Sequence, residues 1–413
     1  MPRHYRVHPR LRCTLPEPGR AELSLPFGCR KLRLAEKVAH TLQEFKERAQ
    51  VTEEEIIQLW GMPVLHALVK YHFLLPPQAC AAVEGGLCTA TPKPVGRPLA
   101  VCDLDQLQAR DTVLLHAPIQ TTRCGEISVA GGGQRVRAQL GLGICAPPGA
   151  ECDAVLLDLD FGSQLHSTNL HLFDLGDVVF QPEVDSAANV GERLHYLCSQ
   201  IVPTGARLLL LGGDHAQARY SIAALSAAYP HIGVLQFDAH PDLYAVGNES
   251  DGVLNHANVM HWVRRMPHVQ TIWQVGLRDF FLQPTTGLRL QDDPKLNALS
   301  AFEAQTQGYG RMFRHMDRKL AWFISFDVDV LAGSELPHTA TPVLGGLDLY
   351  GLLACFETLF SDFHIVGMEF VEVGDAPQGA QGAAAIAARL ASRFLFHLNH
   401  ATPSTGLAYV PAA

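Results

Sequence analysis

Three segments of the chain share one pattern and decide the predicted fold: ARLLLLGGDH (206–215), IGVLQFDAH (232–240) and AWFISFDVDV (321–330). Each is an apolar run that ends in aspartate or histidine. Similar runs recur from about residue 100 onward and alternate with longer helical patterns at 189–202, 216–229 and 348–360. This alternation predicts an α/β domain in which helices cover both faces of a parallel sheet, giving three layers. The further runs are DTVLLHAPI (111–119), DAVLLDLDF (153–161), TIWQVGLRD (271–279) and HIVGMEFVEV (364–373).

The polar ends of the three deciding segments carry residue types that bind metals. In an open α/β sheet the ligand site lies outside the carboxyl ends of the strands, so we expect these side chains to meet there. A single Asp-x-His or Asp-x-Asp at a strand end is usually a helix cap or a polar turn, but three in order favour a site. The six candidates are His215, Asp238, His240, Asp242, Asp327 and Asp329.

Four carboxylates gathered in a partly dry site repel one another unless cations neutralise them. Two divalent cations would do so, and oxygen ligands mixed with imidazole suit Mn²⁺, with Fe²⁺, Ni²⁺ and Co²⁺ as alternatives. The three motifs contain no cysteine, which disfavours structural zinc. The sequence therefore predicts a binuclear metal centre.

From about residue 110 to 400 the chain resembles the ureohydrolase superfamily of arginases, agmatinases and formiminoglutamases. Besides the three metal motifs, the resemblance includes FDLGDV (173–178), VGLRD (275–279), TATPVLGGL (339–347) and VGMEFVEVGD (366–375). It implies a three-layer α/β/α parallel sheet of arginase type. It also implies a Mn²⁺-dependent hydrolase that splits a guanidino carbon–nitrogen bond and releases urea, and assembly into trimers or hexamers, or a dimer.

The resemblance also implies a role for each site residue. One Mn²⁺ would be held by His215, Asp238, Asp242 and Asp327, and the other by Asp238, His240, Asp327 and Asp329. Glu372 would bind the cationic nitrogens of the substrate, and His256 would carry a proton to the leaving amine. Asp242, His256 and Glu372 then form the expected catalytic set, while Asp214 is expected to fix its loop.

Three departures from the family pattern concern the substrate. Arginases bind the α-carboxylate of free arginine partly through an asparagine at the position of Tyr244, and Gly252 replaces a second polar residue. An Asp-Pro pair that usually follows the Asp-x-Asp motif is missing, so the loop 333–337 is expected to differ. We therefore expect the substrate to be something other than free arginine, with Tyr244 in the substrate-binding surface.

Residues 1–78 are predicted to form a separate α+β, winged-helix-like recognition or accessory domain, joined by a linker at 79–100 to the metallohydrolase domain at 101–413. Two short strands around PEPG (16–19) precede apolar residues at helical spacing, and Thr52 with Glu55 forms a capping box. Residues 1–50 hold eleven Lys and Arg against five Glu, a balance of +6, whereas the whole chain has a net charge of −9. Such a basic stretch can bind a peptide or nucleic acid, although most charged stretches are solvated surfaces.

Several functions remain open at this point. The guanidino group can belong to an arginine within a peptide, which would become ornithine, or to agmatine, another small guanidine or free arginine, and a formimino compound is a further alternative substrate. A non-catalytic protein that binds nucleic acid or peptides is a second class, which the six intact ligand positions disfavour, and nucleic acid is the less favoured ligand. A deacetylase-type zinc amidohydrolase is disfavoured because no His-His dipeptide occurs. Ten cysteines without a CxxC pair, and no long apolar run, favour a cytoplasmic protein that does not bind membranes.

Overall fold

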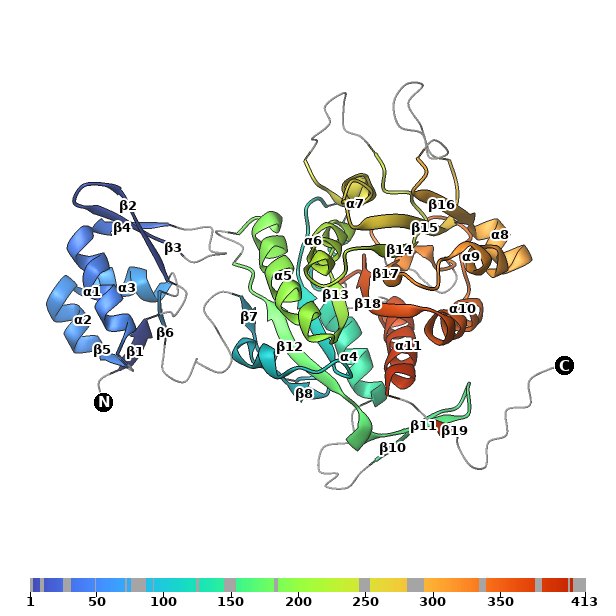
Figure 1. The fold of residues 1–413 in the computed structure, drawn as a ribbon, viewed down its shortest axis with the longest axis horizontal. Coiled ribbons are helices and arrows are strands. Elements are labelled where there is room, and N and C mark those ends of the chain that lie inside the picture. The colour runs from blue at the N-terminus through green and yellow to red at the C-terminus, as the bar shows by residue number, and fades with distance from the viewer. Residues whose placement is uncertain are drawn as a thin grey trace.

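A computed structural model describes most of the chain, and its largest part is a twisted sheet with helices on both sides (Figure 1). No helix among the described residues is both long enough and apolar enough to cross a lipid bilayer. The described ranges are 3–7, 11–24, 31–48, 50–70, 73–75, 87–91, 93–123, 126–144, 154–181, 185–244, 253–280, 293–333, 339–375, 381–399 and 402–403.

The large sheet has ten strands, and all its neighbouring pairs are parallel except β12 with β7. Parallel pairing places the carboxyl ends of these strands along one edge of the sheet. The order is β16 (Leu296–Ser300), β15 (Val269–Leu277), β14 (Ile232–Phe237), β17 (Ala321–Asp327), β18 (His364–Val371), β13 (Arg207–Gly212), β9 (Thr112–Ala117), β12 (Leu172–Val178) and β7 (Cys88–Thr89), with β8 (Arg97–Pro98) also on β12.

Two hydrophobic cores lie on opposite faces of this sheet. Leu209 and Leu211 of β13 belong to one core, whereas Leu208 and Leu210 belong to the other, because side chains alternate along a strand. The first core includes residues of α4 (Gly132–Ile144), α8 (Ala301–Gln307), α9 (Gly310–His315), α10 (Leu349–Asp362) and α11 (Gln381–Leu398). The second includes residues of α5 (Ala187–Ile201), α6 (Ala218–Ala224) and α7 (Val259–Val263). The predicted three-layer α/β/α fold is confirmed.

The apolar run 153–161 is an exception, since the prediction that it forms a strand of the parallel sheet is wrong. Its described part forms β10 (Val155–Asp158) in a small antiparallel sheet with β11 (Ser163–His166) and β19 (Thr402–Pro403). Val155 and Leu157 are 50% and 44% exposed. Asp158 instead faces α11, where Arg389 and Arg393 both bind its carboxylate. Asp158 and Asp160 alternate with apolar residues, a pattern typical of a strand with one exposed face rather than a strand covered by helices on both faces.

Near the amino terminus, the described residues between 4 and 75 form two three-stranded sheets and three helices around their own core. The capping box of Thr52 and Glu55 is present at the start of α2, and the strands on either side of PEPG pair as an antiparallel hairpin. The elements are β1 (His4–Val7), β2 (Arg12–Glu17), β3 (Arg20–Ser24), β4 (Leu32–Ala35), α1 (Glu36–Lys46), β5 (Val51–Thr52), α2 (Glu53–Trp60), α3 (Met62–Lys70) and β6 (Leu74–Leu75).

The range expected as a linker, 79–100, contains ordered structure in its second half. Strands β7 and β8 pair with β12, and Val95 is buried in the core of the large domain, where its N–H donates to Asp174 Oδ2 at 2.9 Å. Residues 79–86 lie outside the described residues. The division into 1–78 and 101–413 therefore stays a prediction, and strands β7 and β8 belong structurally with the large sheet.

Candidate metal centre

The six predicted metal-ligand residues follow three strands whose carboxyl ends lie close together. His215 begins a 3-10 turn after β13, Asp238 directly follows β14, and Asp327 is the last residue of β17. β14 and β17 are neighbours, with Phe237 paired to Phe326, and β18 joins β17 to β13. The order of the strands in the sheet therefore brings three motifs that are distant in sequence together in one cluster.

The first half of the cluster surrounds the His215 imidazole. Its Nδ1 atom lies 3.0 Å from Asp238 Oδ2, 2.8 Å from Asp242 Oδ2 and 3.4 Å from Asp327 Oδ2. This nitrogen is buried and has no hydrogen-bond partner, although three carboxylate oxygens lie within 3.4 Å of it. An imidazole nitrogen and acidic oxygens that converge in this way are suitable ligands for a divalent cation.

The second half is built around Asp238 and Asp329. His240 Nδ1 lies 2.9 Å from Asp329 Oδ2 and 3.7 Å from Asp238 Oδ1. The ligand atoms form two sets, the atoms of each set lie within 4.8 Å of one another, and Asp238 belongs to both sets. The structure therefore brings five of the six predicted residues together as two overlapping groups, and the sixth, Asp327, lies 3.4 Å from His215 Nδ1. The two sets are His215, Asp238 and Asp242, and Asp238, His240 and Asp329.

Burial makes this concentration of acidic groups unstable unless it is neutralised. Asp238 is 1% exposed, and its burial together with the charges of Asp242 and Asp329 raises its pKa to about 8. Burial together with the charges of Asp329 and Asp238 also raises the pKa of Asp327 well above its ordinary value. Burial opposes ionisation of Asp329 too, but the hydrogen bond from His240 lowers the pKa of Asp329. Such a cluster takes up protons or cations, and its mixed oxygen and imidazole donors fit cations.

Backbone conformation also distinguishes the site. Among the described residues, three residues other than glycine have positive φ, and two of them, Asp242 (50°) and Glu372 (61°), are predicted site residues. The third is Asp279, at 63°. Non-glycine residues with positive φ are costly and cluster at functional sites. The strain here accompanies the turn that brings each carboxylate back toward the strand ends.

Glycine at position 213 allows the close approach of two loops. A Cβ atom there would lie 1.9 Å from the carbonyl oxygen of Ile119, which no rearrangement of a side chain could relieve. The Gly213 carbonyl accepts a hydrogen bond from Glu372 N at 2.8 Å. The GGDH motif therefore holds both the His215 turn and the backbone of Glu372.

Glu372 and His256 lie beside this cluster. Glu372 is 4% exposed and its Oε1 accepts a hydrogen bond from His215 N at 2.9 Å, while burial and then Asp214 raise its pKa well above the ordinary value. His256 begins the 3-10 turn before α7, and its Nδ1 lies 2.5 Å from Thr122 Oγ1. Asp214 accepts hydrogen bonds from Thr121 and Ala216, which agrees with its expected role in fixing the loop.

Tyr244 lies on the same side of the site as His256. Its backbone N–H donates to the carbonyl of Ala257 at 3.1 Å, and its side chain is 40% exposed. The segment before it is also tied to α7, because Met260 N donates to the Asp242 carbonyl. Gly252 and most of the loop 333–337 lie outside the described residues.

A series of buried polar side chains contacts Nε2 of His215, and the sequence did not predict it. His215 Nε2 lies 2.9 Å from Ser325 Oγ, and this hydroxyl donates to Glu369 Oε1 at 2.7 Å. Gln217 and Ser221 donate to the other oxygen of Glu369 at 3.0 and 2.8 Å. The signal was available in SFDVD, since Ser325 lies two residues before Asp327 on the same face of β17.

Arg278 is a second group that the sequence did not reveal. It donates to the carbonyls of Asp329 at 2.6 Å and Leu344 at 3.1 Å, and its own N–H donates to Ala239 at 3.2 Å. It therefore connects the DAHPD segment, the Asp329 turn and the loop around Leu344. This explains why an arginine follows β15 in the VGLRD motif.

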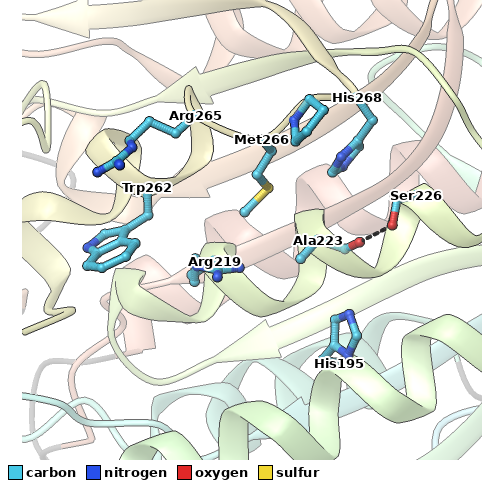
Figure 2. A pocket seen from close by; sticks show the side chains of 9 residues that line it. His195, Arg219, Ala223, Ser226, Trp262, Arg265, Met266 and His268 are labelled. Atoms are coloured by element: carbon cyan, nitrogen blue, oxygen red, sulfur yellow. Dashed lines mark hydrogen bonds between the residues drawn. The ribbon is translucent and has the colours of Figure 1, made fainter. Parts of the chain in front are cut away.

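A separate cavity of about 450 Å³ lies in the helical layer of α5, α6 and α7 (Figure 2). None of the predicted site residues lines it, and its lining is rich in cationic and imidazole groups rather than carboxylates. It is distinct from the cluster of the six candidate metal ligands, which we call the metal-type cluster. The lining residues are His195, Arg219, Ala223, Ser226, Trp262, Arg265, Met266, Pro267 and His268.

An arginase-type α/β sheet with acidic and imidazole groups at its strand ends defines the class of protein as a hydrolase of the ureohydrolase type. The Arginase family model matches residues 113–398, more than half of the chain. The chain belongs to the arginase family, so the resemblance inferred from the motifs is confirmed, and it is a hydrolase that acts on guanidino carbon–nitrogen bonds.

Individual relatives agree with this assignment. An agmatinase of Sodalis glossinidius is 30% identical over 229 residues, which cover 55% of this chain and 70% of that protein. The structure of a hypothetical agmatinase from Burkholderia thailandensis has a TM-score of 0.58 at 24% identity, covering 72% of this chain and 87% of that one. Arginase from Bacillus subtilis has a TM-score of 0.54 at 19% identity, with coverages of 69% and 98%. These two structures support the fold.

Proposed function

We propose that the protein is a binuclear Mn²⁺ hydrolase that removes urea from a guanidino group. The observation that carries the proposal is the pair of overlapping ligand groups that share the buried Asp238. His215, Asp238, Asp242 and Asp327 would hold one cation, and Asp238, His240, Asp327 and Asp329 the other. Two divalent cations, when bound, would lower the pKa of water and so supply hydroxide near neutral pH.

The remaining residues bind the substrate and move a proton. Glu372 is assigned to the guanidinium, because a carboxylate pairs with its nitrogens and fixes the orientation of the central carbon. A guanidinium beside Glu372 would also favour the ionised carboxylate that burial disfavours. Water adds to the guanidino carbon, the bond to the substituted nitrogen breaks, and this nitrogen needs a proton to leave as an amine. We assign this proton transfer to His256, with Thr122 Oγ1 setting the orientation of the imidazole.

For the substrate, we propose an arginine within a peptide, which would be converted to ornithine. Tyr244 supports this choice, because a half-exposed aromatic ring replaces a polar anchor for the carboxylate of a free amino acid. The second candidate is agmatine or another small guanidine or formimino compound. The agmatinase relatives favour this alternative.

The amino-terminal unit is proposed to bind a peptide, as a recognition module for the substrate. The sheet of β2, β3 and β4 has β2 and β4 at its edges, and an extended peptide can add as a further strand to such an edge. Titration of the whole protein with labelled peptides and with duplex DNA at several salt concentrations would separate peptide recognition from nucleic-acid binding. We also propose that the protein is a cytoplasmic homo-oligomer.

The catalytic proposal is tested by measuring urea after metal removal and reloading with Mn²⁺. Agmatine, arginine, acetyl-arginine amide and a short arginine peptide should be compared, with Glu372→Gln as the control that retains the metal-type cluster. We expect urea from at least one of the substrates that lack a free carboxylate, and at least a hundredfold less with Glu372→Gln, since charge pairing in a buried site is worth several kcal/mol. If none of these guanidines releases urea, the proposed function is wrong.

A further inference from the structure

Four large apolar side chains stand exposed on the loops that follow the strands of the site. Tyr244 follows β14, Val253 precedes the His256 turn, Phe280 follows β15, and Leu344 follows β17. Their exposed fractions are 40%, 86%, 99% and 94%. We call these four residues the apolar rim. Single exposed apolar residues are ordinary, but several on loops that adjoin one site mark a binding surface.

Tyr244 and Val253 lie beside His256. Tyr244 N donates to the Ala257 carbonyl at 3.1 Å. The Val253 carbonyl accepts from Asn258 Nδ2 at 3.0 Å, and Asn258 ends the 3-10 turn that begins with His256. The backbone of this half of the apolar rim is therefore hydrogen-bonded to the turn that carries the residue assigned to proton transfer.

Phe280 and Leu344 lie beside the other half of the metal-type cluster. Arg278 N donates to the carbonyl of Ala239, which lies between Asp238 and His240 in the chain, and Phe280 comes two residues later. The Arg278 side chain donates to both the Leu344 carbonyl at 3.1 Å and the Asp329 carbonyl at 2.6 Å. The apolar rim thus connects to the candidate ligands from the β14, β15 and β17 sides.

Solvent reaches the cluster through an opening beside His240, whose neighbour Ala239 accepts the hydrogen bond from Arg278 N. The His240 side chain is 33% exposed, whereas those of His215 and Asp238 are 1% exposed, so solvent meets the cluster near His240. A permanent partner on the apolar rim would block this opening. The group that covers the apolar rim must therefore bind and dissociate with the substrate, and it must have an apolar surface next to a guanidino group.

We propose that the apolar rim binds the hydrophobic residues on either side of an arginine in a peptide substrate. This inference rests on the proposed function and specifies its substrate class. The arginine side chain would enter the site, its backbone would remain at the opening, and the neighbouring side chains would cover Tyr244, Val253, Phe280 and Leu344. Each apolar contact should raise kcat/KM by about tenfold, because burial of one such side chain is worth that order of affinity.

The test compares urea release from acetyl-Leu-Arg-Leu-amide, acetyl-Ser-Arg-Ser-amide and agmatine by the full chain loaded with Mn²⁺. We expect kcat/KM for the leucine peptide to exceed that for the serine peptide by at least tenfold. Leu344→Ser and Val253→Ser should each reduce this ratio by about tenfold and leave the rate with agmatine unchanged. Leu142→Ser is the matched control, since Leu142 is 81% exposed on α4 and belongs to no part of the site.

Two results would overturn the inference, and they separate it from the proposed function. If agmatine is hydrolysed while the two peptides are equal or inert, the hydrolase stands and the apolar rim has no such role. If Leu344→Ser and Leu142→Ser change the peptide ratio equally, the apolar rim also fails. Absence of urea from all three compounds would instead refute the proposed function itself.

Discussion

Ser325→Ala isolates the contact that orients the His215 imidazole. The Ser325 hydroxyl lies 2.9 Å from His215 Nε2 and 2.7 Å from Glu369 Oε1, and it is fully buried. Removing the hydroxyl leaves Nδ1 of His215 facing the carboxylates, but Nε2 then lacks the contact that fixes the orientation of the ring. Loss of such an outer contact typically weakens metal binding by about 10 to 100-fold, or about 1.4 to 2.7 kcal/mol.

Ser221→Ala provides the matched control. The Ser221 hydroxyl donates to Glu369 Oε2 at 2.8 Å, so its loss also removes one buried hydrogen bond from the same carboxylate, but it does not touch His215. Both variants should lose about 1 kcal/mol of unfolding free energy in the metal-free state. Calorimetric titration with Mn²⁺ should then show weaker binding in Ser325→Ala alone. Equal Mn²⁺ affinities in the two variants would refute the orienting role of Ser325.

Three further predictions concern the proton carrier, the charge of the cluster and the loop contact. Thr122→Val should lower kcat at least tenfold with little change in KM, because the His256 imidazole loses the hydroxyl at its Nδ1. The raised pKa of Asp238, about 8 in the folded protein, means that the folded state holds this proton more tightly. The protonated Asp238 carboxyl therefore contributes to stability at low pH, and this contribution is lost as the pH rises toward 8. Metal-free protein should melt at a lower temperature at pH 8.5 than at pH 6. Mn²⁺ should raise the melting temperature more at pH 8.5. Gly213→Ala should destabilise the fold by about 3 kcal/mol in thermal or urea unfolding, because its Cβ meets the Ile119 carbonyl.

Each of these predictions has a clear contrary result. Thr122→Ser should retain the hydroxyl and most of kcat, so equal losses in the serine and valine variants would exclude an orienting hydrogen bond. An equal gain in melting temperature from Mn²⁺ at both pH values would contradict proton release by the cluster. Gly143→Ala is the control for Gly213→Ala, since a Cβ at Gly143 has no atom within 4 Å. Equal stabilities of the two glycine variants would contradict the close loop contact.

The sequence predicted the fold and the metal-type cluster because both depend on patterns that are local in the chain. Apolar runs that end in GGDH, DAHPD and SFDVD specify buried strands, and parallel pairing then places their ends at one edge. The run 153–161 failed because an apolar stretch does not show whether helices cover both of its faces. Ser325 and Arg278 were missed because their partners lie in other segments, 44 residues away at Glu369 and 51 at Asp329.

The sequence predicts the type of reaction better than it predicts the substrate. The catalytic end is recognised by charged residues in short motifs, whereas the opening is built from exposed side chains on loops, such as Val253 and Leu344, that no motif marks. Their position became meaningful when the hydrogen bonds of Asn258 and Arg278 placed them beside the site. Specificity therefore depends on tertiary contacts that short-range patterns do not encode.

The most direct test of the central claim is anomalous diffraction from crystals of the protein grown with Mn²⁺. The account predicts two manganese peaks about 3.5–4 Å apart, the usual spacing of such pairs. One should contact His215, Asp238 and Asp242, and the other should contact Asp238, His240 and Asp329. A single peak, no peak, or peaks elsewhere on the protein would contradict the binuclear centre.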